Sequence, residues 1–169
     1  WVQIQEAGAG LWTYAVGSNG IITTAYEDSL NARFVSTSGT NSPITKLVTP
    51  PLDLTSVLAP TVTFAYGQPN WVGDQNELKV YYRISSSDPW VEIAHYTEDV
   101  PVWTVTSLFL PNASATYQIA FEGINNYGYA NVLDSVTVEQ GPADDVATIS
   151  IDIDANITPG AFAPMATVQ

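Results

Sequence analysis

The sequence predicts an all-β protein, a jelly-roll β-sandwich of two antiparallel sheets. Between residues 60 and 138, β-branched and aromatic residues alternate with polar ones in successive short runs, which is the pattern of half-buried strands. Gly, Pro, Asn and Ser separate the runs, and no helix is needed to explain them. The residues predicted to face inward at this period of two are Phe64, Tyr66, Leu78, Val80, Tyr82, Ile119, Phe121, Val136 and Val138.

Candidate strands run from residue 12 to residue 138. The first four, at residues 12–16, 21–26, 32–36 and 44–48, are the least regular, and a Gly-Ser-Asn-Gly turn separates the first two. Pro50 and Pro51 end the fourth strand or place it at a sheet edge. The regular part follows with runs at 61–66, 77–83, 90–94, 116–122 and 132–138. Three tryptophans fall in strand-like runs and are predicted core residues, namely Trp12, Trp90 and Trp103.

A change of composition at residues 139–145 marks a domain boundary. The strand pattern gives way there to a short acidic Gly/Pro linker. We therefore expect one jelly-roll domain at 1–140, and a linker with a further strand at 141–169. That strand, at 146–154, either begins a following β-domain or docks on the main sandwich as an extra strand.

Charge and composition exclude several classes of function. The 169 residues include four basic and seventeen acidic ones, so the net charge is -13 and the chain repels phosphate backbones. No apolar run approaches the roughly 20 residues of a membrane helix. We expect no nucleic-acid partner and no membrane insertion. The chain has no cysteine, which excludes disulfides, thiolate chemistry and zinc ribbons.

Four segments carry a resemblance to a known family. In order and spacing, residues 45–54, 73–83, 117–123 and 132–138 resemble the MAM-like jelly-roll family, and in particular the cleaved-adhesin and choice-of-anchor J modules of secreted Bacteroidetes proteins. The resemblance covers about residues 1–138. It implies export to the cell surface or medium, and a place in a larger multidomain polypeptide beside peptidase or adhesin domains. It also implies a first strand upstream of Trp1.

The same resemblance implies a structural calcium ion as a candidate cofactor. Several family members hold calcium with an acidic residue of that first strand, loop oxygens and an aspartate of the last strand. In this chain Asp28 and Asp134 are the candidate ligands, although family members usually have two aspartates where this chain has Asp134-Ser135. The alternatives are a solvated loop carboxylate at Asp28 and a hydrogen-bonded carboxylate at Asp134.

Aromatic residues in two polar loops suggest a ligand site. Trp71 lies between Asn70 and Asp74 in a ten-residue loop at 67–76, and Tyr127 and Tyr129 lie in a Gly/Asn-rich loop before the last strand. Exposed rings beside amides and carboxylates are what a sugar needs, because its C–H face stacks on a ring while its hydroxyls form hydrogen bonds. The alternative is that these rings pack in the core or hold the loops in place.

Residues for catalysis are sparse. His95 is the only histidine, and no nucleophile elbow or metalloprotease spacing surrounds it. Glu92 and Glu122 would form a carboxylate pair only if their strands were neighbours. We therefore expect a non-enzymatic adhesion or substrate-contact module of a secreted or surface bacterial protein, with a glycan or a host or matrix protein as ligand. The alternatives are a carbohydrate-binding module attached to a glycosidase or peptidase, and a structural spacer or assembly unit.

Overall fold

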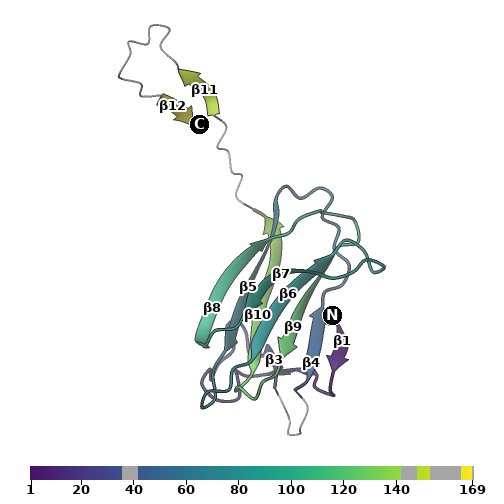
Figure 1. Cartoon of the computed structure of the whole chain (residues 1–169), viewed down its shortest axis with the longest axis vertical. Helices are drawn as coiled ribbons and strands as arrows, with labels where there is room; N and C mark the ends of the chain where they lie inside the picture. The colour runs from purple at the N-terminus through teal and green to yellow at the C-terminus, as the bar shows by residue number, and fades with distance from the viewer. Residues whose placement is uncertain (36–41, 142–147, 153–164, 169) are drawn as a thin grey trace.

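The computed structural model describes residues 1–35, 42–141, 148–152 and 165–168. Within these residues the chain forms two five-stranded antiparallel sheets and one two-stranded sheet, and no helix there could span a membrane (Figure 1). Sheet A has the order β1-β4-β9-β6-β7 and sheet B the order β2-β3-β10-β5-β8. Their strands are β1 (Val2–Ala7), β2 (Trp12–Ala15), β3 (Asn31–Phe34), β4 (Ile44–Val48), β5 (Pro60–Gln68), β6 (Glu77–Arg83), β7 (Val91–Tyr96), β8 (Val100–Phe109), β9 (Gln118–Ile124) and β10 (Asn131–Gln140).

The predicted all-β jelly-roll sandwich is confirmed. Strand β6 shows why its sequence reveals the fold, because Leu78, Val80 and Tyr82 are buried while the residues between them are only partly buried. Phe64 from sheet B meets Phe121 from sheet A edge to face, with ring centroids 5.0 Å apart. All nine residues predicted to face inward lie in this core or pack against it.

Two elements at the start of the chain differ from the prediction. β1 (Val2–Ala7) was not predicted, and five of its six residues are exposed, so it lacks the alternation that marks a half-buried strand. Residues 21–26 were predicted as a strand but form an irregular segment. Ile22 is buried against Gly67, where an added Cβ would lie 2.4 Å from the Ile22 Cδ1, and the Trp103 indole donates to the Thr24 carbonyl. These contacts with β5 and β8 hold residues 21–26 in place, and the segment does not pair as a strand.

The three tryptophans predicted as core residues have different environments. Trp12 is buried, lies 5.4 Å from the Phe34 ring and donates its indole N–H to the Thr45 carbonyl, so its core prediction is confirmed. Trp103 is partly buried against a small separate cluster that contains Ile22. Trp90 is also only partly buried and was wrongly predicted as core.

The tail contains a pair of strands. β11 (Thr148–Asp152) lies within the strand predicted at 146–154, and it pairs antiparallel with β12 (Met165–Val168) in a two-stranded sheet. β12 was not predicted. The linker at 142–147 and the turn predicted at 158–160 lie outside the described residues. Two statements about the tail stay predictions. One is the division into a domain at 1–140 and a tail at 141–169, and the other is the choice between a following domain and a docked strand.

Tyr117 provides a stability prediction in the core. Its ring is fully buried and stacks on Tyr82 at 5.4 Å, and within the described residues its hydroxyl has no hydrogen-bond partner. A buried unpaired polar group costs about 1 to 3 kcal/mol, so Tyr117→Phe should raise the free energy of unfolding by roughly 1 kcal/mol. The matched control is Tyr82→Phe, which removes a hydroxyl that accepts a hydrogen bond from Asn112 and should lower stability. Urea unfolding at neutral pH measures both effects, and a loss of stability in Tyr117→Phe would contradict the prediction.

The same residue should make the protein sensitive to alkali. Burial raises the pKa of the Tyr117 hydroxyl, and Tyr82 adds to the effect. In the unfolded chain a tyrosine titrates near pH 10, so above that pH the unfolded state loses its proton first and native stability falls. The Tyr117→Phe variant should therefore lose less stability than the wild type when urea unfolding is repeated above about pH 10.

Candidate functional site

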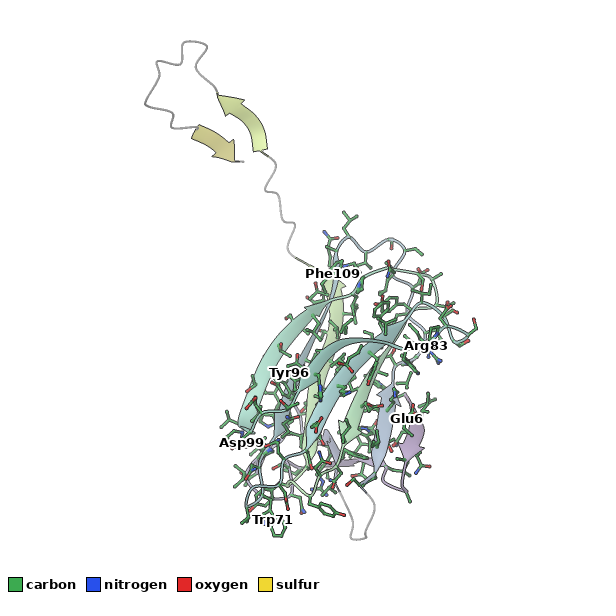
Figure 2. The ribbon with its side chains drawn as sticks, in the orientation of Figure 1. Glu6, Trp71, Arg83, Tyr96, Asp99 and Phe109 are labelled. Carbon is green, nitrogen blue, oxygen red and sulfur yellow. The ribbon has the colours of Figure 1, made fainter. Side chains whose placement is uncertain are left out.

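The topology brings two loops to the same end of the sandwich. Because β6 runs antiparallel to β9, the start of β6 lies opposite the end of β9, with Glu77 paired to Ile124. In the other sheet, Gly67 at the end of β5 pairs with Val132 at the start of β10. The loops at residues 69–76 and 125–130, which we call the two end loops, must therefore be neighbours. Figure 2 places Trp71 at this end.

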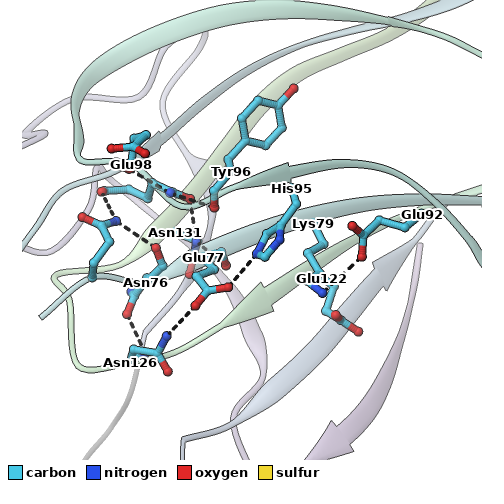
Figure 3. Close-up of polar contacts among 12 residues, drawn as sticks. Asn76, Glu77, Lys79, Glu92, His95, Tyr96, Glu98, Glu122, Asn126 and Asn131 are labelled. Atoms are coloured by element: carbon cyan, nitrogen blue, oxygen red, sulfur yellow. Dashed lines mark hydrogen bonds and ion pairs between the residues drawn. The ribbon is translucent and has the colours of Figure 1, made fainter.

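The buried side chain of Asn76 joins the two end loops. Its Oδ1 accepts hydrogen bonds from the backbone N–H groups of Asn126 and Gly128, both at 2.9 Å (Figure 3). The Tyr129 N–H also donates to the Pro69 carbonyl at 3.2 Å. A side chain at position 128 would come within 3.0 Å of Asn76, so the absence of a Cβ at Gly128 allows this close approach. These bonds fix one loop to the other.

A layer of buried amides supports the loops from below. Gln68 is fully buried and donates through Nε2 to the carbonyls of Tyr96 and Glu98, at 3.1 and 2.9 Å. Asn131 is equally buried and donates to the Glu77 carbonyl at 3.0 Å (Figure 3). These hydrogen bonds hold the loops in one conformation, although within the described residues the buried Asn131 Oδ1 and Asn76 Nδ2 have no partner. The amides therefore connect the end loops to β6 and to the turn after β7.

The tip of the first end loop is strained. Trp71 and Asp74 exchange backbone hydrogen bonds of 3.0 and 2.9 Å, and between them Val72 and Gly73 both have positive φ, as a type I′ turn requires. The Asn70 side-chain oxygen accepts from the Gly73 N–H at 2.9 Å. A left-handed conformation costs a side chain such as valine about 1 to 2 kcal/mol. Yet Val72 is 90% exposed and Trp71 is 49% exposed, so the turn holds two apolar side chains in solvent.

Replacement of Val72 by asparagine should relieve this strain. Asparagine tolerates a positive φ, so Val72→Asn should raise the free energy of unfolding by about 1 kcal/mol. Val102→Asn is the matched control, because Val102 is also exposed but lies in the extended strand β8 and should show no gain. Urea unfolding of both variants tests the difference. Equal or lower stability of Val72→Asn would contradict strain at the tip.

The predicted ligand residues divide into exposed rings and loop supports. Tyr127 is 42% exposed and Trp71 is 49% exposed, and they lie on two loops that hydrogen-bond each other. The Tyr129 ring instead packs on Gly20, where an added Cβ would lie 2.1 Å from the ring. Asn70 uses its side-chain oxygen within the turn, and its N–H donates to Asp99 Oδ1 at 2.9 Å. The role of these residues in ligand binding stays a prediction.

The candidate calcium ligands belong to segments other than the end loops, with Asp134 in β10 and Asp28 between β2 and β3. Asp134 accepts hydrogen bonds at Oδ2 from the Tyr26 and Glu27 N–H groups, at 3.0 and 3.1 Å, and at Oδ1 from the Ser135 N–H. Asp28 is exposed, with φ of 55°. Within the described residues, no three His, Cys, Asp or Glu side chains come together as a metal site. A carboxylate already bound to three N–H groups serves to anchor a loop, and the described residues do not by themselves form a calcium cage. Calcium binding stays a prediction.

The two carboxylates considered for catalysis are not on neighbouring strands. Strand β6 lies between β7, which carries Glu92, and β9, which carries Glu122. Each carboxylate forms an ion pair with a lysine, Glu122 with Lys46 and Glu92 with Lys79. His95 on β7 is paired with the carboxylate of Glu77 on β6 (Figure 3). A catalytic pair of Glu92 and Glu122 required neighbouring strands, and the structure does not have this arrangement.

A buried charge cluster on the outer face of sheet A was not predicted. Lys46 lies between Glu6 and Glu122, and the side chains of Lys46 and Glu122 are each only 7% exposed. The Tyr81 hydroxyl donates to Glu122 Oε1 at 3.1 Å, and the Lys46 ammonium lies 4.7 Å from the Tyr81 ring centre. Burial, with the neighbouring Glu122, raises the pKa of Tyr81. The cluster joins strands β1, β4, β9 and β6. It could not be predicted, because the sequence does not show the order and register in which these strands pair.

Comparison with known proteins identifies similar folds. No protein-family model matches the chain, and no curated protein sequence matches it significantly. The K2 cleaved adhesin domain of Lys-gingipain superposes with a TM-score of 0.60 at 16% identity, over 80% of this chain and 87% of that one. The K1 domain of the same protein from Porphyromonas gingivalis W83 gives 0.57 at 16% identity, over 83% and 99% of the two chains. TmCBM61, solved in complex with β-1,4-galactotriose, gives 0.56 at 11% identity, over 82% and 88%. The chain therefore has an adhesin-like jelly-roll fold, and the narrower MAM-like or choice-of-anchor J assignment stays a prediction.

Proposed function

We propose that this chain is a non-catalytic binding module that contacts its ligand through the two end loops. The observation that carries the proposal is the exposed pair Trp71 and Val72, held in a strained turn above buried amides. Strained backbone persists only where the surroundings impose it, and it gathers at functional sites. Hydrogen bonds fix the backbone that carries Trp71, so less backbone entropy is lost on binding, and an exposed tryptophan on such a backbone is well suited to a binding hot spot.

A glycan is the ligand that this surface suits best. Trp71 and Tyr127 offer two exposed rings, and Asp74, whose backbone is hydrogen-bonded to that of Trp71, has an exposed side chain that can accept hydrogen bonds from sugar hydroxyls. The fold is shared with TmCBM61, which was solved with a bound galactotriose, and with adhesin domains. A host or matrix protein is the other candidate ligand, and the binding experiment below distinguishes the two.

The cellular setting is part of the same proposal. The acidic, cysteine-free composition and the fold shared with cleaved adhesin domains support a secreted or surface-attached module of the MAM-like, choice-of-anchor J type. Such a module would act within a larger polypeptide, where it brings a neighbouring domain to its substrate or the cell to a surface.

Binding to immobilised glycans and matrix proteins tests the proposal. We expect Trp71→Ala to weaken the strongest glycan interaction about tenfold or more, because a stacked ring at a hot spot contributes on the order of 1 to 3 kcal/mol. The unfolding temperature should hardly change, since Trp71 is half exposed. Tyr14→Ala, at an even more exposed ring on β2, is the matched control and should bind normally. Unchanged glycan binding by Trp71→Ala would exclude the end loops as the binding surface. Binding to a matrix protein but to no glycan would show that the ligand is a protein.

The calcium prediction has a separate test. An ion that binds the native state stabilises it by RT ln(1 + [L]/Kd), so the family resemblance predicts an unfolding temperature several degrees higher in calcium than in chelator. The difference should disappear in Asp134→Ala, although that variant also loses the anchor of the Tyr26 and Glu27 N–H groups. Equal unfolding temperatures of the wild type in calcium and chelator would contradict a calcium site in residues 1–169.

A further inference from the structure

A pocket lies at the opposite end of the sandwich from the two end loops. Trp71 precedes β6 and Arg83 ends it, and Figure 2 shows these two residues at opposite ends of the domain. The pocket has a volume of about 240 Å³. Its wall is mainly apolar, with three polar side chains at its border. Among its lining residues are Tyr82, Ile84 and Val91, with Arg83, Asp88 and Asn112 as the polar group.

Hydrogen bonds hold the walls of this pocket in place. Asn112 donates through Nδ2 to the Tyr82 hydroxyl at 2.9 Å. The Ile84 carbonyl accepts from the hydroxyls of Ser114 and Thr116. Two segments far apart in the sequence, 82–91 and 112–116, are thus joined around the pocket. Walls held by internal hydrogen bonds are typical of small-molecule sites, which are largely pre-formed.

Arg83 has unused hydrogen-bonding capacity at this pocket. Its Nε and Nη2 atoms donate to Gln118 Oε1 at 3.0 and 2.7 Å, and Nη1 donates to the Ser86 carbonyl at 3.0 Å. These bonds use three of the five guanidinium N–H groups, which leaves one on each Nη atom. The guanidinium also lies 4.2 Å from the Trp90 ring centre, which fixes its plane.

Arg83 also lacks a carboxylate partner within the described residues. Both lysines of sheet A form ion pairs with glutamates, but Arg83 bonds only to an amide and a carbonyl. Among the described residues Arg83 forms no ion pair, although acidic side chains outnumber basic ones by seventeen to four in the sequence. Paired N–H groups of a guanidinium match the two oxygens of a carboxylate. The unused groups therefore suit a carboxylate supplied by a ligand.

We propose that this pocket binds a sugar acid, such as one uronic acid residue of a glycan. The carboxylate would bond to Arg83, and the ring would lie on the apolar wall. Asp88 accepts from the Ser85 hydroxyl through one oxygen, so its other oxygen remains for a ligand hydroxyl. The negative charge of Asp88 repels a ligand carboxylate, and hydrogen bonds from ligand hydroxyls to Asp88 offset this repulsion. Sugar acids have such hydroxyls, so they suit the site better than simple apolar acids. The volume lies below the roughly 300 to 1,000 Å³ of typical drug-sized sites, which limits the ligand to a small group such as a single sugar unit. The site is separate from the end loops and does not depend on their function.

Titration with D-glucuronate, followed by NMR of the ¹⁵N-labelled protein, tests this site. We expect saturable shifts at the Arg83 Nε–H and the Trp90 indole N–H. D-glucuronamide has the same ring but no charge, and it should bind at least about tenfold more weakly, because hydrogen bonds to charged groups contribute more than neutral ones. Trp71→Ala should bind glucuronate like the wild type.

Two variants complete the experiment. Arg83→Gln should lose at least about tenfold in glucuronate affinity. Arg83→Lys should also lose affinity, because it keeps the charge but not the paired N–H groups. Equal binding of glucuronate and glucuronamide by the wild type would overturn the proposal even if the variants failed to fold. So would full affinity in a folded Arg83→Gln variant, or the absence of saturable shifts at millimolar glucuronate.

Discussion

Replacement of Lys46 by methionine should lower the free energy of unfolding by about 3 to 5 kcal/mol, among the largest effects expected of a single substitution. Lys46 neutralises Glu122, whose side chain is only 7% exposed, and it also binds Glu6 on the edge strand β1. Without the ammonium group, Glu122 remains as an uncompensated buried charge. Urea unfolding of the Lys46→Met variant measures the loss.

The nearby pair of Lys79 and Glu92 is the matched control. Their side chains are 23% and 41% exposed, so Lys79→Met should lower stability by less than about 1 kcal/mol. In addition, the double variant Lys46→Met, Glu122→Met should recover most of the stability, because it removes both charges together. Similar losses in Lys46→Met and Lys79→Met would contradict the assignment of Lys46 and Glu122 as a buried, coupled pair.

Replacement of Asn76 by alanine should have the second-largest effect, at about 2 to 4 kcal/mol, because it leaves one buried and one partly buried backbone N–H group without an acceptor. These are the N–H groups of Asn126 and Gly128, which bind Asn76 Oδ1. Urea unfolding gives the size of the loss. Hydrogen exchange at residues 126 and 128 should accelerate more than exchange in the central strands, because the loss falls on the loop.

Asn126→Ala is the control for this variant. Its partly buried side chain makes one longer hydrogen bond to Glu77, at 3.2 Å, and its removal should cost less than about 1 kcal/mol. Unchanged exchange at residues 126 and 128 in Asn76→Ala would show that Asn76 does not hold the two end loops together.

The strands with regular alternation could be predicted from the sequence. In β6, apolar and polar residues alternate so clearly that the pattern identifies both the strand and its inward face. β1 was missed because an edge strand with both faces exposed has no such pattern. Residues 21–26 have the β-branched composition of a strand, but the contact of Ile22 with the side-chain-free face of Gly67 decides their structure. That contact joins residues 45 positions apart and has no local signal.

The candidate site was predicted only in part for the same reason. The turn residues around Trp71 and the Gly/Asn-rich loop around Tyr127 reveal two polar loops with exposed rings. The sequence does not show that Asn76 joins these loops, or that Tyr129 packs on Gly20. Such contacts depend on which strands pair and in what register, and a one-residue shift would remove them.

The most direct test of the central claim is NMR mapping of the bound glycan. Once immobilised glycans have identified a ligand, its titration into the ¹⁵N-labelled protein shows which backbone N–H groups it affects. If the two end loops form the binding surface, the largest shifts will fall at residues 69–76 and 125–130, and Trp71→Ala will abolish them. For a glycan without carboxylate groups, shifts confined to the sheet faces or to the opposite end of the sandwich, with both loops unaffected, would contradict the account.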